Sequence, residues 1–176
     1  MLITKISNEK QLDIVVELAY TIWNEYFTPI IGQAQVDYML DKFQSKKSIG
    51  QQLQNGFVYY LITNNSEPVG YTGIIIKEKE LFLSKIYILS TERNKGIGKE
   101  AISFLEQFAL EQGAQKITLT VNKDNLDTIE AYKKMGFVNL GSVVQDIGNN
   151  FVMDDYKMEK ELDFTFMHHS IDSQAD

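Results

Sequence analysis

The chain has 176 residues, of which 44% are hydrophobic and 23% charged, and it contains no cysteine. This length and composition suit one globular domain with a full hydrophobic core, and they exclude disulfides, thiol nucleophiles and cysteine metal sites. The formal net charge of −7 argues against a nucleic-acid partner and favours cationic acceptors, although solubility alone also explains it.

The first third of the sequence predicts one strand followed by helices. Residues 2–6 alternate apolar and polar side chains, as a half-buried strand does. An amphipathic helix follows, with apolar residues at helical spacing: Leu12, Val15, Val16, Ala19, Ile22, Trp23 and Tyr26. Thr28 should end this helix, because it precedes a proline and is disfavoured in the helical conformation. Shorter helices are expected over about 33–43 and 48–54.

An antiparallel meander is predicted next. Residues 57–63 are rich in β-forming side chains and are followed by a turn at 64–67. A second strand is expected over 69–77, where Gly70 and Gly73 indicate a bulge or unusually close packing. A charged turn then leads into a third strand.

The stretch 81–98 (LFLSKIYILSTERNKGIG) predicts an anion site, because an apolar strand runs through a glycine-bearing turn into a helix over 96–112. The first N–H groups of a helix have no intrahelical acceptor, and the helix dipole attracts anions to that end. Gly96 and Gly98 would let a phosphate approach the backbone. We therefore expect the main-chain N–H groups of residues 94–99 to bind a pyrophosphate, although the glycines alone also fit an ordinary turn. Three basic residues would add positive charge: Arg93, Lys95 and Lys99.

The remaining chain predicts a strand over 116–121, a short helix that ends at Gly136, and closing strands over 137–146 and 151–162. Asn125 precedes the helix and fits an N-cap. The domain is expected to span residues 1–162.

Residues 163–176 lack periodicity and are expected to form a poorly ordered tail. The only histidines, His168 and His169, lie there without a carboxylate or cysteine cluster, so no metal site is predicted. No apolar run approaches the roughly 20 residues that cross a bilayer, and no signal-peptide pattern is present. We expect a cytoplasmic monomer or homodimer without a membrane partner.

Two motifs resemble those of the GCN5-related N-acetyltransferases, the GNAT family. The string R-N-K-G-I-G is similar to the family signature [QR]-x-x-G-x-[GA], and Asn125, Tyr132, Gly136 and Phe137 are spaced like its second motif. The resemblance implies a single α+β domain (α/β in some schemes). Its central sheet would be mixed and mostly antiparallel, with about seven strands, flanking helices and a splay at the cofactor strand. It also implies direct transfer of an acetyl group from acetyl-CoA to an amine.

The resemblance also implies roles for individual residues. Acetyl-CoA or CoA would be held by main-chain atoms of the strand, by the glycine turn and by the later helix: Ile86, Tyr87, Ile88, Arg93, Asn94, Lys95, Gly96, Ile97, Gly98, Lys99, Asn125 and Lys134. Tyr132 would be the general acid toward the departing thiolate, although a tyrosine packed in the core also fits its position. A backbone N–H at a strand bulge near Ile88 would polarise the thioester oxygen.

A general base is missing where relatives carry a glutamate. An ammonium with a pKa near 10 must lose a proton before it attacks, which costs roughly 4 kcal/mol at pH 7. The matching positions are Phe82 and Ser84, and neither is a base. Proton loss through ordered water is preferred, with Glu80 as the alternative.

The acceptor is expected to bind at Trp23, Tyr26, Phe27 and Tyr38, although aromatics at helical spacing are more often core. The W-x-x-Y of the first helix, the FVYYLI strand and the closing hairpin resemble the PaiA-like branch, which implies a small cationic amine such as spermidine. Two alternatives stay open: acetylation of a protein lysine or N-terminus, and a sensor domain that binds acetyl-CoA without catalysis.

Overall fold

The structure, a computed structural model, describes residues 1–165. Its elements in chain order are β1 (Leu2–Lys5), α1 (Glu9–Tyr26), α2 (Thr28–Ile31), α3 (Gln33–Gln44), α4 (Lys46–Gln54), β2 (Val58–Asn64), β3 (Glu67–Lys77), β4 (Glu80–Ile88), the 3-10 turn η1 (Ser90–Glu92), α5 (Ile97–Glu111), β5 (Lys116–Asn122), α6 (Leu126–Lys134), β6 (Val138–Gly148) and β7 (Phe151–Glu161).

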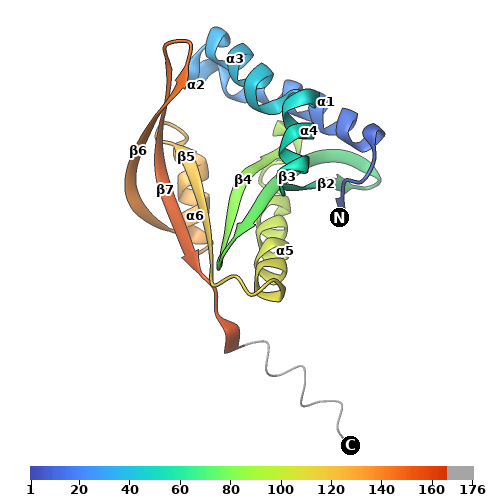
Figure 1. The fold of residues 1–176 in the computed structure, drawn as a ribbon, viewed down its shortest axis with the longest axis vertical. Coiled ribbons are helices and arrows are strands. Elements are labelled where there is room, and N and C mark those ends of the chain that lie inside the picture. The colour runs from blue at the N-terminus through green and yellow to red at the C-terminus, as the bar shows by residue number, and fades with distance from the viewer. Residues whose placement is uncertain (166–176) are drawn as a thin grey trace, which may run out of the picture.

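The strands form one sheet in the order β1-β2-β3-β4-β5-β7-β6 (Figure 1). Neighbouring strands are antiparallel except β4 and β5, which run parallel. The predicted α+β domain, with a mixed and mostly antiparallel sheet of about seven strands, is confirmed.

β4 and β5 separate soon after they meet. Residues 80–82 of β4 pair with residues 116–118 of β5, but beyond Phe82 the edge of β4 that faces β5 stays unpaired as far as Ile88. Figure 1 shows the two strands diverging, with β1–β4 on one side of the gap and β5–β7 on the other. The backbone groups of β4 beyond Phe82 that face β5 therefore have no strand partner, and the splay expected from the sequence is present.

Helices cover both faces of the sheet. α1, α3 and α4 pack on one face, where the core contains Val15, Ile22 and Tyr59. α5 and α6 cover the other face, in a core that contains Tyr60 and Leu105. Successive residues of β2 thus enter different cores, which is the alternation of a strand buried on both sides.

A bulge in β4 lies at Ser84. Gly73 of β3 pairs with Lys85 and Ile74 pairs with Leu83, so Ser84 is an extra residue without a partner on β3. Because side chains alternate along a strand, one extra residue reverses the faces beyond it. Leu83 belongs to the core under α5, whereas Lys85 contacts α4 on the opposite face.

The predicted bulge near Ile88 is wrong, because Ile88 pairs regularly with Gly70. The close packing expected at the two β3 glycines is present. A Cβ at Gly70 would lie 2.4 Å from the carbonyl oxygen of Tyr87, and a Cβ at Gly73 would lie 2.9 Å from the ring of Tyr59.

Two local details differ from the sequence analysis. α1 ends before Thr28 as expected, but Thr28 then begins the short helix α2 instead of leaving the helical conformation. Pro29 fits in its first turn, where no hydrogen bond needs the missing proline N–H. Asn125 directly precedes α6, yet its side chain makes no capping bond, so the N-cap prediction is wrong for that side chain. The predicted tail lies mostly in 166–176, and that part, with both histidines, is outside the described residues.

Candidate functional site

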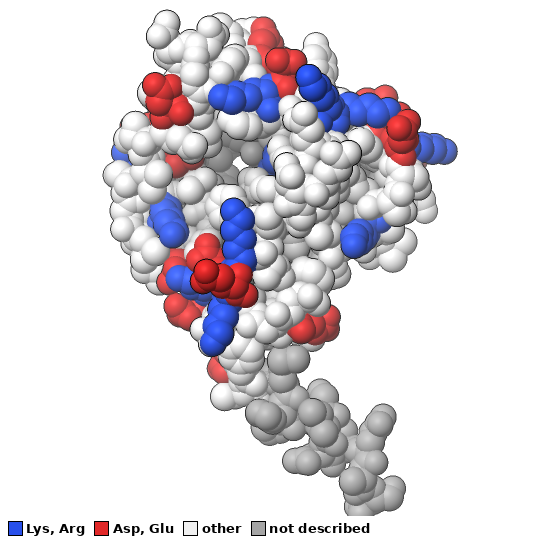
Figure 2. Space-filling view, viewed as in Figure 1, with Lys and Arg blue, Asp and Glu red and all other residues white. Residues whose placement is uncertain are grey.

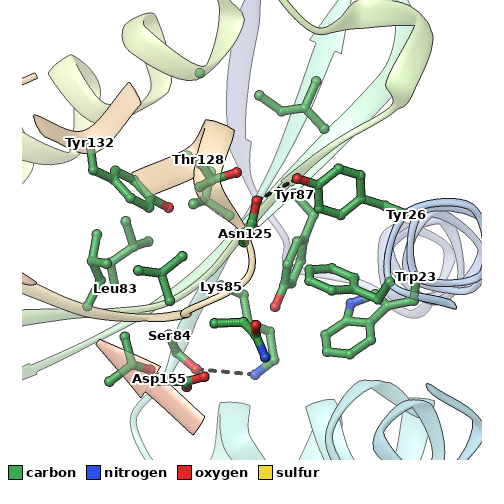
Figure 3. Close-up of a pocket in the computed structure, with 18 of the residues that line it drawn as sticks. Trp23, Tyr26, Leu83, Ser84, Lys85, Tyr87, Asn125, Thr128, Tyr132 and Asp155 are labelled. Atoms are coloured by element: carbon green, nitrogen blue, oxygen red, sulfur yellow. Dashed lines mark hydrogen bonds between the residues drawn. The ribbon is translucent and has the colours of Figure 1, made fainter. Parts of the chain in front are cut away.

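A cavity of about 580 Å³ occupies the gap between the two halves of the sheet, where it is lined by α1, α3, β4, β5, α6 and the β6–β7 hairpin. This face of the molecule is hollowed there, and Lys, Arg, Asp and Glu side chains of both signs are interspersed over it (Figure 2). Figure 3 shows Trp23 and Tyr26 approaching the cavity from one side and Asn125, Tyr132 and Asp155 from others. The cavity therefore brings together residues that are far apart in the sequence.

The predicted anion-binding turn borders this cavity through Asn94 and Gly98. Positive φ angles of 62° at Asn94 and 85° at Gly96 lead the chain into the start of α5. The first hydrogen bond of that helix is donated by Glu100 to the Gly96 carbonyl. Within residues 1–165, no main-chain acceptor is paired with the N–H groups of residues 94–99. The turn thus offers a row of donors to a ligand.

Seven of the residues predicted to bind the cofactor line the cavity: Ile86, Tyr87, Ile88, Arg93, Asn94, Gly98 and Asn125. The other five are outside its lining: Lys95, Gly96, Ile97, Lys99 and Lys134. Lys95 forms an ion pair with Glu92 at 3.0 Å, and Ile97 is buried in the core. The side chains of Lys95 and Ile97 are therefore engaged elsewhere, whereas the main-chain N–H groups of the turn are not paired within residues 1–165.

Tyr26 connects three parts of the site. Its hydroxyl donates to Asn125 Oδ1 at 2.5 Å, which ties α1 to the start of α6 (Figure 3). The guanidinium carbon of Arg93 lies 3.9 Å from the centre of the Tyr26 ring, and Arg93 Nε donates to the Ile88 carbonyl at 3.2 Å. Tyr26 therefore positions two of the predicted cofactor residues as well as forming part of the cavity wall.

Aromatic rings form the wall on the α1 side. The ring centroid of Trp23 lies 4.4 Å from that of Phe27 and 5.5 Å from that of Tyr87, and all three line the cavity. Tyr38 was expected here as well, but the structure does not place it in the lining. Its hydroxyl donates to the Ile147 carbonyl at 2.6 Å, so Tyr38 joins α3 to the β6–β7 hairpin instead.

Tyr132 projects from α6 with its hydroxyl toward the cavity (Figure 3). The side chain is buried, and its ring packs 5.4 Å from that of Phe137. Burial raises the pKa of Tyr132 above its ordinary value, so the hydroxyl keeps its proton at neutral pH. The group is a hydrogen-bond donor where it meets the cavity.

Asp155 is a carboxylate in the cavity that the sequence analysis missed. It projects from β7, is only 5% exposed and lines the cavity (Figure 3). Burial raises the pKa of Asp155 to about 6, and neighbouring Asp154 adds to this effect, while Thr120 and Lys123 counter it in part. A carboxyl group with this pKa is ionised at neutral pH and still takes up a proton readily.

Glu80, the alternative base in the sequence analysis, lies away from the cavity. Its carboxylate accepts a hydrogen bond from Thr118 at 2.5 Å and approaches Lys116 to 3.7 Å, and it is absent from the cavity lining. The reason is its place at the start of β4, where β4 and β5 are still paired. The structure therefore does not support Glu80 as the base.

Lys85 is the second charged residue that the sequence analysis missed. It is 6% exposed, yet it lines the cavity, and its Nζ donates to Gln52 Oε1 at 2.7 Å. A longer contact of 3.4 Å joins Nζ to Ser84 Oγ. Burial lowers the pKa of Lys85 to about 8, so most of the side chains carry a proton at pH 7.

Both residues carried a signal in the sequence. Lys85 interrupts an otherwise apolar strand, and a lysine in such a strand must either be buried or face a cavity. Asp155 follows Phe151 and Met153 at a spacing of two residues, which places all three on one face of β7. The sequence indicated a bulge or close packing at Gly73, but it did not identify Ser84 of β4 as the extra residue, which decides the face of Lys85.

Within residues 1–165, no cluster of three or more His, Cys, Asp or Glu side chains is arranged to hold a metal ion. Over the same residues, no helix combines the length and apolar character needed to cross a membrane.

Comparison with known proteins adds an independent line of evidence. Residues 16–137 match the family described as the acetyltransferase (GNAT) family. The chain is 26% identical over 130 residues to N-acetyltransferase 8 of Homo sapiens, an alignment that covers 70% of this chain and 53% of that protein. The chain therefore spans about half the length of this curated relative.

Solved structures share the fold. A PaiA N-acetyltransferase from Thermoplasma acidophilum, in complex with coenzyme A, superposes with a TM-score of 0.73 at 20% identity, covering 92% of this chain and 99% of that one. A ribosomal-protein-alanine N-acetyltransferase from Brucella melitensis gives 0.69 at 21% identity, covering 92% and 100%.

Proposed function

Because the chain belongs to the GNAT acetyltransferase family, we propose that it transfers an acetyl group from acetyl-CoA to the amino group of a small molecule. The observation that carries this proposal is the splayed strand pair. Its gap holds a cavity that is bordered at the glycine turn by unpaired N–H groups and that contains both a carboxylate and a tyrosine hydroxyl.

The residues present fit coenzyme A. The unpaired edge of β4 offers backbone donors and acceptors at Ile86, Tyr87 and Ile88 for an amide-bearing arm, and the N–H groups of residues 94–99 suit a pyrophosphate. Each N–H to phosphate bond contributes about 1.5–3 kcal/mol. Bound acetyl-CoA would supply the activated acetyl thioester.

The ionisable groups of the cavity divide the proton transfers between them. Asp155 would take the proton from the acceptor ammonium, directly or through one water, because it is ionised at neutral pH and buried beside the cavity. Tyr132 would donate a hydrogen bond to the departing sulfur, since its raised pKa keeps the hydroxyl protonated. The sequence led us to expect proton loss through ordered water; here a carboxylate from β7 would accept the proton instead.

A small acceptor is favoured over a polypeptide by the extent of the cavity. The volume of about 580 Å³ would be shared by the end of acetyl-CoA and the acceptor, so the space left beside the cofactor suits a small molecule. Side chains of α3 and of the β6–β7 hairpin enclose the part beyond β4, including Met39, Phe43, Gln145 and Met153. The likeness to a ribosomal-protein-alanine N-acetyltransferase keeps a protein acceptor as an alternative.

The direct test is release of free thiol from acetyl-CoA in the presence of amines. The panel should contain amino acids, alkylamines, spermidine, an aminoglycoside and peptides with a free N-terminus or lysine. Turnover with small amines supports the proposal, and turnover with peptides alone would move the acceptor to proteins. Tight binding of acetyl-CoA without turnover by any amine would instead indicate a sensor domain.

Replacing Tyr132 by Phe is expected to lower kcat at least about tenfold, because a donor to the departing thiolate is lost. The ring and its packing on Phe137 are kept, so folding should not change. Tyr20→Phe is the matched control, since Tyr20 is 65% exposed and is not among the residues that line the cavity. The rates are measured by thiol release at saturating acceptor. An unchanged rate in Tyr132→Phe would remove this hydroxyl from the mechanism.

A further inference from the structure

The ammonium of Lys85 is buried beside the cavity with neutral partners. Its two hydrogen-bond acceptors are Gln52 Oε1 at 2.7 Å and Ser84 Oγ at 3.4 Å. The faces of two aromatic rings, Tyr59 and Phe57, lie 5.3 and 5.8 Å from Nζ. No carboxylate of residues 1–165 forms an ion pair with this ammonium. An ammonium has three N–H donors, so at least one remains for a ligand.

Such an arrangement is unfavourable in the absence of a ligand. A buried charge without a counter-ion destabilises the folded state, and lysines are almost never fully buried unless they are paired. Burial lowers the pKa of Lys85 to about 8, which still leaves most of the population protonated at pH 7. The cavity therefore presents a positive charge that no carboxylate of residues 1–165 neutralises through an ion pair.

The other charges on the cavity lining are engaged or exposed. Glu92 pairs with Lys95, Arg93 stacks on Tyr26, and Asp127 is exposed on α6. Asp155 is the remaining buried charge, with a sign opposite to that of Lys85. In the described part of the chain, Lys85 and Asp155 do not form an ion pair with each other. One cavity thus holds a buried cation and a buried anion that do not form an ion pair with each other.

From these two opposite charges in one cavity we propose that the acceptor is an amine that also carries a carboxylate. Lys85 would bind the carboxylate, and Asp155 would face the amino group. The inference rests on the proposed acetyl transfer and names its substrate class. The amino group would lose its proton to Asp155 and form the new amide bond to the acetyl carbon, while the C–S bond of the thioester breaks and coenzyme A leaves as its thiolate, which accepts a hydrogen bond from Tyr132. The carboxylate of the acceptor stays unchanged on Lys85. A polyamine fits the same cavity poorly, because its second ammonium would meet the Lys85 charge. On this reading the spermidine expected from the sequence is a weak substrate.

The experiment compares amino acids with neutral analogues of the same shape. The probes are ω-amino acids of two to six carbons and L-α-amino acids, each beside its carboxamide, together with putrescine and spermidine. Thiol release gives kcat/KM for each acid and amide, and the readout is their ratio. We expect the wild-type protein to prefer at least one acid by about tenfold or more, as one charge-assisted hydrogen bond provides. In Lys85→Met that ratio should fall to about one.

Lys47→Met is the matched control, because it removes the same charge from an exposed position on α4. It should keep the wild-type ratio. Thermal unfolding checks that Lys85→Met is folded; its midpoint should be at or above that of the wild type, since the variant no longer buries a charge. Lys85→Gln serves as a second neutral variant if Lys85→Met does not fold.

A binding measurement separates this inference from the proposed function. Isothermal titration of the CoA-saturated protein with each N-acetyl amino acid and its amide needs no turnover. Tighter binding of an acid, lost in Lys85→Met, supports the subsite even if no amine releases thiol, an outcome that would refute only the acetyl transfer. Equal binding of acids and amides by the wild type overturns the inference, as does faster turnover of spermidine than of every amino acid.

Discussion

Replacing Asp155 by Asn is expected to lower kcat/KM at pH 7 by about 100- to 1,000-fold, the range of a positioned general base. The amide keeps the size of the side chain but cannot accept the proton of an ammonium. Acetyl-CoA binding should stay within about threefold of wild type, because Asp155 projects from β7 and the proposed cofactor contacts lie on β4 and the glycine turn. Thiol release measured over a range of acceptor concentrations that reaches saturation gives kcat/KM, and titration of the protein with CoA gives the cofactor affinity.

The pH profile supplies a second readout. Asp155 acts as a base only when ionised, so the wild-type kcat/KM should increase as pH rises through about 6, and this limb should be absent in Asp155→Asn. Protonation of Asp155 also affects the stability of the folded state. The pKa in the folded state, about 6, lies above the ordinary value of 3.8, so the native state binds more protons and loses stability as pH rises across that window. The variant should therefore be at least as stable as the wild type at pH 7.

Asp154→Asn is the matched control for this change. Asp154 adjoins Asp155 on β7 but is paired with Lys123 and is absent from the cavity lining. It should change kcat/KM by no more than about threefold, as is usual for a surface ion pair. If both variants lose activity equally, or if Asp155→Asn keeps wild-type activity, proton removal does not pass through Asp155.

Much of the architecture could be predicted because the local sequence patterns of the strands, turns and helices agree with the elements that the fold contains. The run of β-forming side chains in residues 57–63, the glycine turn after β4 and the glycine after α6 each have a direct physical interpretation. The splay between β4 and β5 was predicted only from the family resemblance, because no local sequence pattern indicates where two paired strands separate. The side chain of Asn125 shows the same limit. Its position matches an N-cap, but its Oδ1 accepts a hydrogen bond from the hydroxyl of Tyr26, which is 99 residues away in sequence.

The charged residues of the site were harder to predict for a related reason. The family resemblance implies a glutamate base on β4, but the matching positions of this chain are Phe82 and Ser84. The cavity instead draws its carboxylate from β7, a strand that pairs with β5. One bulge residue in β4 also decides which face Lys85 reaches. Chemistry that is divided between distant strands becomes visible only when the sheet order and the bulge are known.

The largest effect on stability is expected from Gly70→Ala. A Cβ at this position would lie 2.4 Å from the carbonyl oxygen of Tyr87 and 3.2 Å from Cα of Ile88, both of which are backbone atoms that cannot rotate away. β4 would have to move away from β3 along the segment that borders the cavity. Overpacking of this kind costs about 2–3 kcal/mol. Urea unfolding should show this loss as a lower midpoint.

The same movement displaces the backbone groups through which β4 would hold the cofactor, so CoA affinity should fall at least about tenfold in the fraction that remains folded. Gly50→Ala is the control: Gly50 lies inside α4 with nothing within 4 Å of a new Cβ, and the change should stabilise the protein by about 0.5–1 kcal/mol. Stability within about 0.5 kcal/mol of wild type for Gly70→Ala would mean that β3 and β4 can separate freely. In that case the close strand contact at Gly70 would not be what fixes the unpaired edge of β4.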